Sequence, residues 1–186
     1  ATKGDIVSLS RRAIVNDDMG VFYELLGGMG DAAALTIEEA CYALLTANSG
    51  TGANYPGTAN PLFHSTRSNI GTTGAMTAAT MGSARTIMMK QKDPASKVYL
   101  ATVPRIWLGP LELGDAARAI YASQWDPSKT TQVPNPVYGA IPPGNVIDSP
   151  YLSVSSATRH YFFADSARMP VIAVGFINGR EAPEVI

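Results

Sequence analysis

The segment that begins at Asn16 constrains the fold most, because polar residues there precede a long run with helical periodicity. Asn16, Asp17 and Asp18 are residue types that accept backbone N–H bonds at a helix start and complement the positive end of its dipole. The apolar residues that follow recur every three or four positions: Phe22, Leu25, Leu26, Met29, Ala33, Ile37, Ala40, Cys41 and Leu44. This spacing predicts a long helix. Residues 5–15 mix apolar and polar side chains, as a partly exposed strand does.

Glycines interrupt this helical pattern, at Gly27, Gly28 and Gly30. Each costs about 1 kcal/mol relative to alanine in a helix interior, so we expect a kink or a break there. Thr36 and Glu39 match the T-x-x-E capping box. A second helix is therefore expected to begin at Ile37 and to end near Ala47.

The rest of the chain predicts further helices and strands separated by two long loops. Apolar spacing predicts helices over 77–92 and from Pro110 to about Ser123. Short apolar runs predict strands at 97–103, 145–148, 160–164 and 170–177, and Asn178-Gly179 is typical of a type I′ hairpin turn. Residues 125–144 contain five prolines and are expected to form a loop. This order of elements indicates an α+β fold rather than a βαβ series.

Residues 48–75 are rich in Gly, Thr, Asn and Ser, and Arg67 carries their one formal charge. Disordered linkers usually carry more charge and fewer apolar residues than this stretch, which contains Tyr55, Leu62 and Phe63. A loop of this length is uncommon in an isolated compact domain. We therefore expect an ordered loop that lies against a neighbouring molecule.

The composition argues against several classes of function. Charged residues make up 16% of the chain, below the roughly 25% usual for soluble domains, so part of the surface is expected to be covered by partners. The net charge of -1 provides no sequence-independent attraction for nucleic acid. The sequence has no apolar run of membrane-spanning length, and no charged start followed by an apolar run that would suggest a signal peptide. Its single cysteine, Cys41, is expected to be buried and structural. These features favour a protein that is made in a reducing cytoplasm.

The sequence motifs that could indicate a cofactor-binding or metal-binding site are weak. Residues 28–33 match G-x-G-x-x-A, but the expected preceding strand and the following acidic residue of a dinucleotide site are missing. We interpret the match as small residues that permit close helix packing. His64 is expected to be a hydrogen-bonded loop histidine rather than a metal ligand, because ligand spacings such as H-E-x-x-H or C-x-x-C are absent. We therefore expect neither a cofactor nor a metal.

One alternative function is a hydrolase or a processing serine protease. Its nucleophile would be Ser153, Ser155 or Ser156, its base His160, and its orienting acid Asp148 or Asp165, since these groups need only converge in space. The G-x-S-x-G elbow of many hydrolases is absent. Serines between strands are usually found in turns, and we prefer that interpretation.

The sequence resembles the major head subunit of Mu-like phages, a family of capsid proteins with the HK97-like fold. The resemblance rests on short segments in a conserved order: residues 11–18 with Phe22, 42–45, 62–64, 89–93, 103–104, 126–129, 132–136, 161–165 with 170–172, and 179–183. It covers most of the chain. No segment alone is a strong motif, but their order and spacing are specific.

The resemblance implies an HK97-like capsid fold with a long spine helix, a peripheral domain and an axial domain. It implies that residues 1–92 hold the extended-loop strand and the peripheral domain with its spine helix. Residues 93–157 would form the axial domain, and 158–186 would return to the peripheral domain. Because the chain starts at Ala1 without Met and ends in an apolar stretch, we expect it to be truncated at both ends, without the N-terminal arm and the last peripheral strand.

The implied function is that of a structural, non-enzymatic shell protein that assembles in the host cytoplasm and is located in the virion. Its copies would associate as hexamers and pentamers into an icosahedral shell around DNA, with other capsid, scaffold or portal proteins as further partners, and without specific nucleic-acid recognition or a membrane. Candidate subunit-interface residues are Arg11, Arg12, Asp17, Asp18, Tyr55, Phe63 and Arg67. For Arg11 and Arg12, pairing with carboxylates of another subunit and a solvated strand edge remain equal alternatives.

Overall fold

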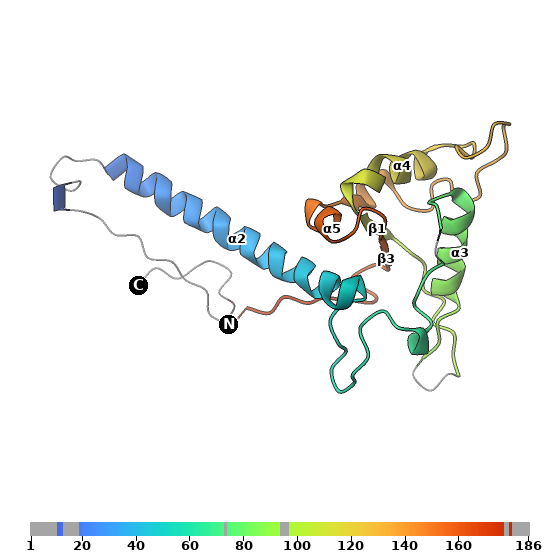
Figure 1. Ribbon diagram of the computed structural model, residues 1–186, viewed down its shortest axis with the longest axis horizontal. Helices are drawn as coiled ribbons and strands as arrows, with labels where there is room; N and C mark the ends of the chain where they lie inside the picture. Colours follow the sequence, from blue (N-terminus) through green and yellow to red (C-terminus); the bar gives the residue numbers. More distant parts are fainter. Residues whose placement is uncertain (1–10, 13–18, 73, 94–96, 177–178, 180–186) are drawn as a thin grey trace. The chain divides into compact units, whose positions relative to one another are not determined.

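The computed structural model describes residues 11–12, 19–72, 74–93, 97–176 and 179. Its elements are α2 (Met19–Gly50), η1 (Ser65–Arg67), α3 (Ala78–Met89), β1 (Ile106–Gly109), α4 (Leu111–Ala122), η2 (Pro143–Asn145), β2 (Val146–Asp148), α5 (Pro150–Ser155) and β3 (Tyr161–Phe163) (Figure 1). The chain divides into two compact units, Ala1–Ala40 with Val174–Ile186, and Cys41–Ala173. The mixture of helices and a sheet agrees with the predicted α+β class.

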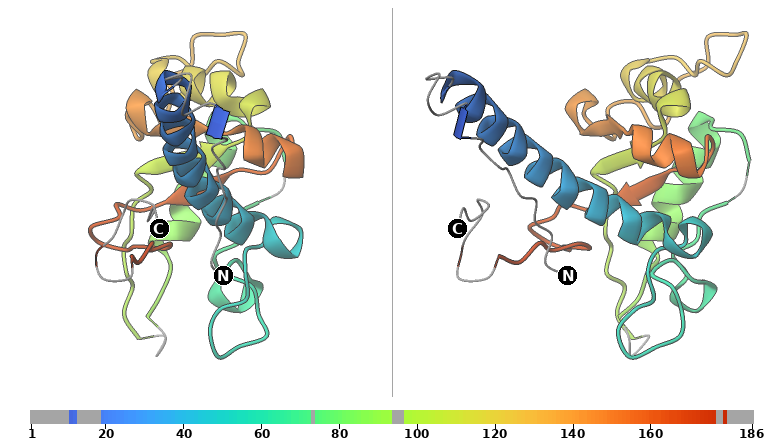
Figure 2. Two further views of the ribbon diagram at one scale, coloured as in Figure 1. Left: turned by 90° about the vertical axis from the view of Figure 1, so that its left-hand side faces the viewer. Right: turned by 60° about the vertical axis from the view of Figure 1, so that its left-hand side comes forward.

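Helix α2 is more continuous than the sequence predicts, and it leaves helical geometry at Ala47, where the sequence predicts its end. It passes through Gly27, Gly28 and Gly30 without a break and departs from helical backbone angles at Ala47–Ser49 and at Gly50, and Figure 2 shows its blue part as an uninterrupted ribbon. The predicted break, and the predicted second start at Ile37, are wrong. The Thr36 hydroxyl donates to the carbonyl of Ala32 at 2.9 Å inside the helix instead of capping a new one. Helix propagation is cooperative, so a helix as long as residues 19–46 tolerates a few unfavourable positions.

The apolar stripe of α2 is only partly as predicted. Met29, Ala33, Ile37 and Cys41 are half-buried and share one face, whereas Leu44 is exposed and its neighbour Leu45 is buried. The thiol of Cys41, which we expected to be buried, is therefore only half-buried. Leu44 and Leu45 lie about 60° and 40° to either side of Cys41 around the helix axis, so the sequence pattern alone does not determine which of them faces the interior.

Residues before α2 lie mostly outside the described part of the chain. Arg11 and Arg12 have helical conformation, so the predicted strand is wrong at these two positions. The remaining residues of that strand, and the predicted cap at Asn16, Asp17 and Asp18, lie outside the described residues.

A three-stranded mixed sheet with the order β2-β1-β3 forms the centre of the unit 41–173. β1 runs parallel to β2 and antiparallel to β3, with Trp107 opposite Val146 on one side and Phe162 on the other. The parallel pair requires a crossover, which α4 and the loop after it provide. The unit therefore contains a single βαβ connection that the predicted order of elements did not include.

Alternation along β1 assigns adjacent residues to opposite faces of this sheet. Trp107 is fully buried among residues of α3, α4 and the 137–146 segment, including Met81, Ile120 and Val146. Leu108 faces a second cluster with Leu45, Leu152 and Tyr161. Two hydrophobic clusters, one on each face, thus hold helices and loops against a very short sheet.

Two predicted strands are absent from the described residues. In 97–103, Val98 and Tyr99 are 62% and 60% exposed and only Tyr99 makes an isolated bridge, to Lys92. The central strand begins two residues after Pro104, at Ile106. Residues 170–176 form no strand either, and the partner half of the predicted Asn178-Gly179 turn lies outside the described residues. A strand needs a neighbouring strand for its backbone hydrogen bonds, which an apolar pattern alone does not guarantee.

The other helix and loop predictions agree with the structure. Thr77 caps α3 through a capping box with Thr80, and α4 ends at Ser123. The loop 125–144 is irregular up to η2 and is tied to α4 by buried Asn135. Two of the serines that we expected in a turn, Ser153 and Ser155, instead form part of the short helix α5, and Ser156 is its C-cap.

The predicted ordered loop over 48–75 is present. Its backbone bonds include Leu62 N–H to the carbonyl of Ala53 at 2.9 Å and Phe63 N–H to that of Thr51 at 2.8 Å. These bonds join the two sides of the loop. Its tip, near Pro56 and Gly57, is exposed.

Candidate functional site

The residues of the alternative hydrolase are occupied by structural hydrogen bonds. The Ser153 hydroxyl accepts the backbone N–H of Leu111 at 2.9 Å, and that of Ser156 accepts the N–H of Arg159 at 3.2 Å. Ser155 is an exposed residue of α5. These bonds cap and connect short elements, so the arrangement has no nucleophile held by a base.

His160 lies in an aromatic environment rather than beside a serine. Its ring stacks on that of Trp107 at 5.9 Å and meets the edge of Phe162 at 5.6 Å, and its Nδ1 is 3.4 Å from the carbonyl of Thr158. Burial lowers the pKa of His160, although the bond to Thr158 opposes this effect. A neutral ring packed in this way supports the sheet.

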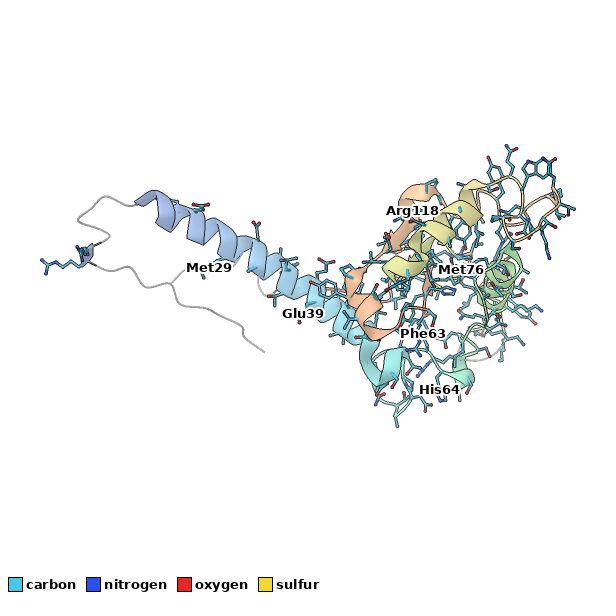
Figure 3. All side chains as sticks on the ribbon, turned by 45° about the horizontal axis from the view of Figure 1, so that its top comes forward. Met29, Glu39, Phe63, His64, Met76 and Arg118 are labelled. Carbon is cyan, nitrogen blue, oxygen red and sulfur yellow. The ribbon has the colours of Figure 1, made fainter. Side chains whose placement is uncertain are left out.

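The candidate acids are also engaged elsewhere. Asp148 pairs with Arg118 of α4, which also pairs with exposed Asp115 at 3.2 Å (Figure 3 shows Arg118). The Asp148 bond raises the pKa of Arg118 most. Asp165 accepts the N–H of Ala167 at 3.0 Å in a turn. The pair with Arg118 therefore ties α4 to the end of β2.

Two of the predicted interface residues come together on the ordered loop. The guanidinium of Arg67 lies 4.9 Å from the centre of the Tyr55 ring and donates to the carbonyl of Pro61. Tyr55 remains 53% exposed. A cation over an aromatic face is worth about 0.5–1 kcal/mol at an exposed site. The contact presents a fixed, uncharged face of the ring to the outside.

The other predicted interface residues do not join this pair. Phe63 is half-buried and packs on Tyr161 at 5.3 Å and on Phe163 at 6.5 Å (Figure 3), so its contacts are inside the subunit. Arg11 and Arg12 are exposed. Asp17 and Asp18 lie outside the described residues. His64, as expected, is a loop histidine: its ring caps η1 by accepting the N–H of Thr66.

A groove of about 630 Å³ lies between the ordered loop, α3 and β3. Its lining includes all three residues of β3, which is an edge strand of the sheet. Apolar side chains, among them Ile87, Met88 and Val171, line much of it. The groove has the character of a binding surface for apolar side chains rather than of a catalytic pocket.

The sequence reasoning missed a segregation of charge along the chain. The charged residues of α2 are all acidic and all exposed: Glu24, Asp31, Glu38 and Glu39 (Figure 3 shows Glu39). Residues 85–105 carry Arg85, Lys90, Lys92, Lys97 and Arg105 against a single acid, Asp93. A count of charge by segment, rather than over the whole chain, would have revealed it.

Two further properties of the described residues bear on the class of protein. They contain no group of three or more His, Cys, Asp or Glu that is placed to hold a metal ion. None of their helices is both long enough and apolar enough to cross a membrane.

Comparison with known proteins identifies the family. A family model described as phage capsid protein matches residues 1–186. The curated proteins and the solved structures that were searched contain no match. Because the family model covers the whole chain, this chain belongs to the phage capsid protein family and has a structural role in the virion.

Proposed function

We propose that the chain is a major head subunit of the Mu-like type with the HK97-like fold. In this proposal α2 is the spine helix, residues 1–92 and 158–186 belong to the peripheral domain, and 93–157 form the axial domain. The observation that carries it is the continuity of α2 through Gly27, Gly28 and Gly30, over residues 19–46. The alternative of a break in that helix was the main departure from the family pattern.

The proposed mechanism is self-assembly. Many copies form hexamers and pentamers through repeated heterologous contacts, and these close into an icosahedral shell around DNA. The subunit presents exposed apolar side chains that such contacts can bury, including Tyr55, Trp125 and Val154. Scaffold, portal and other capsid proteins are further proposed partners, and assembly takes place in the host cytoplasm.

The contacts of the ordered loop belong to this proposal. Tyr55 and Arg67 form a rigid, exposed element, and preorganised aromatic residues lose little entropy when they become buried at an interface. Arg11, Arg12, Asp17 and Asp18 remain proposed interface residues. Phe63 is proposed to act indirectly, because its ring supports the loop from inside.

The direct test is electron microscopy with light scattering on the protein expressed from its complete gene. Closed shells, or rings of five or six subunits, are the expected result. A homogeneous monomer or dimer over a wide range of concentration and salt would contradict the proposal. An assay of ester and peptide hydrolysis on the same sample is expected to find no activity that depends on His160.

A further inference from the structure

We infer that neighbouring copies contact each other through opposite charges: the acidic face of α2 in one copy lies on a basic surface formed by residues 90–93 and 97–100 of the next. This inference rests on the proposed self-assembly and names the surfaces that meet. It assigns a role to the segregated charges, which the fold itself does not use.

The acidic face of α2 is a straight row. Glu24, Asp31 and Glu38 are seven residues apart, so each is rotated only about 20° from the previous one and they span about 21 Å of helix. All three are exposed. Leu35 lies in the same row, between Asp31 and Glu38, and is 56% exposed. The row therefore offers three carboxylates and one apolar side chain to a partner.

The basic surface is built on a short return of the chain after α3. The Leu100 N–H donates to the carbonyl of Gln91 at 2.8 Å, and the ammonium of Lys92 lies 4.9 Å from the centre of the Tyr99 ring. Arg168 joins this surface by donating to the carbonyl of Leu100 at 3.1 Å. Its other cations are Lys90 and Lys97, both exposed.

This surface also carries exposed apolar side chains. Val98 and Tyr99 are 62% and 60% exposed, next to the lysines. The carboxylate of Asp93 accepts the N–H groups of Lys97 and Val98 at 2.8 and 3.0 Å, so it is directed into the turn. On this basic surface, lysines flank the apolar side chains of Val98 and Tyr99. On α2, the carboxylates of Asp31 and Glu38 flank the apolar side chain of Leu35. The two surfaces therefore match in both charge and polarity.

Neither set of charges forms an ion pair among the described residues of its own compact unit. Among described residues, both ion pairs within 4.0 Å use Arg118, with Asp115 and Asp148. Among described residues, no ion pair therefore involves the acidic residues of α2, Glu24, Asp31 and Glu38. The same holds for Lys90 and Lys97. Opposite patches on one molecule favour head-to-tail contact between copies, the kind of contact that closes into rings.

A second copy explains these features better than nucleic acid does. Phosphates would satisfy the lysines but would leave the acidic row without a partner, and they would leave Val98 and Leu35 in water. Contact with another copy buries both apolar groups and pairs both sets of charges. It also fits the net charge of -1, which gives the whole chain no general attraction for polyanions.

The test uses two charge-reversed variants of the full-length protein, separately and mixed. One carries Asp31→Lys and Glu38→Lys, and the other carries Lys92→Glu and Lys97→Glu. Each alone is expected to weaken assembly on the order of tenfold at low salt, as several weak surface pairs become repulsive. An equimolar mixture should recover rings of six, in which the two variants can alternate, because each reversed surface meets its complement on the other variant. Light scattering and electron microscopy measure both effects.

Controls separate this contact from general charge effects. The control variants are Glu112→Lys and Lys129→Glu, both at exposed positions on other parts of the subunit. They are compared with the single variants Glu38→Lys and Lys97→Glu, respectively, because each pair changes the net charge by the same amount. The controls are expected to assemble as the unchanged protein does. Circular dichroism confirms that every variant is folded before assembly is compared.

The outcomes distinguish the inference from the proposed function. Recovery of assembly in the mixture of the two variants supports the inference. If the acidic and basic surfaces paired within a single chain, adding a second variant could not restore that pairing. Normal shells from both reversed variants would overturn the inference and leave the shell function intact. Loss of retained nucleic acid in the lysine variant, with unchanged assembly, would assign the basic surface to nucleic acid instead. Failure of the unchanged protein to assemble would overturn both.

Discussion

At the scale of single residues, Asn135 shows how one buried polar side chain holds a long loop in place. Its amide donates to the carbonyls of Ile120 and Ser123 at 2.6 and 2.9 Å, and its carbonyl accepts the N–H of Val137 at 3.1 Å. These bonds satisfy carbonyls at the C-terminal end of α4, which the helix itself leaves without partners. The loop 125–144 is thus attached to the helix by side-chain chemistry.

We predict that Asn135→Ala destabilises the subunit by about 2–4 kcal/mol, because three buried groups lose their hydrogen-bond partner. Urea unfolding monitored by circular dichroism measures the change. Gln132→Ala, at an exposed position of the same loop, is the matched control and should stay within about 0.5 kcal/mol of the unchanged protein. Equal effects of the two substitutions would show that the Asn135 bonds contribute little.

His160 gives the subunit a dependence on pH with a definite sign. Burial lowers its pKa below the usual 6.5 in the folded state, so the unfolded chain binds a proton first as the pH falls. We predict that the free energy of unfolding decreases below about pH 6.5, by at most about 1.4 kcal/mol per pH unit, until the folded pKa is reached.

His160→Phe should remove this slope while it keeps the ring contact with Trp107. Urea unfolding at several pH values compares the two proteins, and they should differ least above pH 7, where the imidazole is neutral in both states. Asp126, whose pKa is lowered by its bonds to Ser128, affects stability near and below pH 4 and does not mask the effect. An unchanged slope in the variant would contradict the prediction.

At the scale of elements, the glycines of α2 are notable because the subunit does not need them for close packing. A Cβ added at Gly27, Gly28 or Gly30 would meet no atom within 4 Å. The helix nevertheless continues through all three. We therefore predict that Gly27→Ala and Gly30→Ala each stabilise the helix by about 0.5–1 kcal/mol.

Helicity by circular dichroism and thermal unfolding measure this prediction. Gly50→Ala is the contrasting variant: Gly50 has φ of +80°, and an added Cβ would overlap the Arg159 side chain, so it should destabilise the protein. A loss of stability at Gly27 or Gly30 would indicate that these positions are closely packed after all. Stabilised variants that no longer assemble would show that a neighbouring copy requires the glycines.

Element types were more predictable than element pairings. The spacing of apolar residues was sufficient to predict the helices α3 and α4, whose buried faces include Met81 and Ile120. It failed for residues 97–103, which lie outside the sheet, while β1 begins at Ile106. Strand formation depends on partners distant in the sequence, here Val146 and Phe162, and local pattern contains no information about which run obtains them.

At the scale of the whole molecule, the ordered loop is the proposed contact that is simplest to test. Tyr55→Ser removes an exposed ring whose contact within the subunit is Arg67. We predict a loss of stability below about 1 kcal/mol and a clear reduction of assembled mass in light scattering. Arg67 should keep its place because Pro61 and Thr58 still accept its hydrogen bonds.

Tyr138→Ser provides the control for Tyr55, because the two tyrosines are 52% and 53% exposed. Assembly that responds equally to both substitutions would indicate a general effect of surface apolarity. A response to Tyr55 alone would support a specific role for the loop. Unchanged assembly in both variants would remove the loop from the proposed interfaces.

The sequence by itself determined the class of protein, the positions of α3 and α4, the ordered character of the loop 48–75 and the membership of the capsid family, because these depend on local spacing, composition and segment order. The tertiary structure alone decided that α2 is continuous, that β1 lies after Pro104, and that Ser153, Ser156 and His160 serve packing. It also brought Tyr55 and Arg67 together. The physical reason is the same in each case: these outcomes depend on free energies of contact between residues far apart in the chain, which a local pattern does not contain.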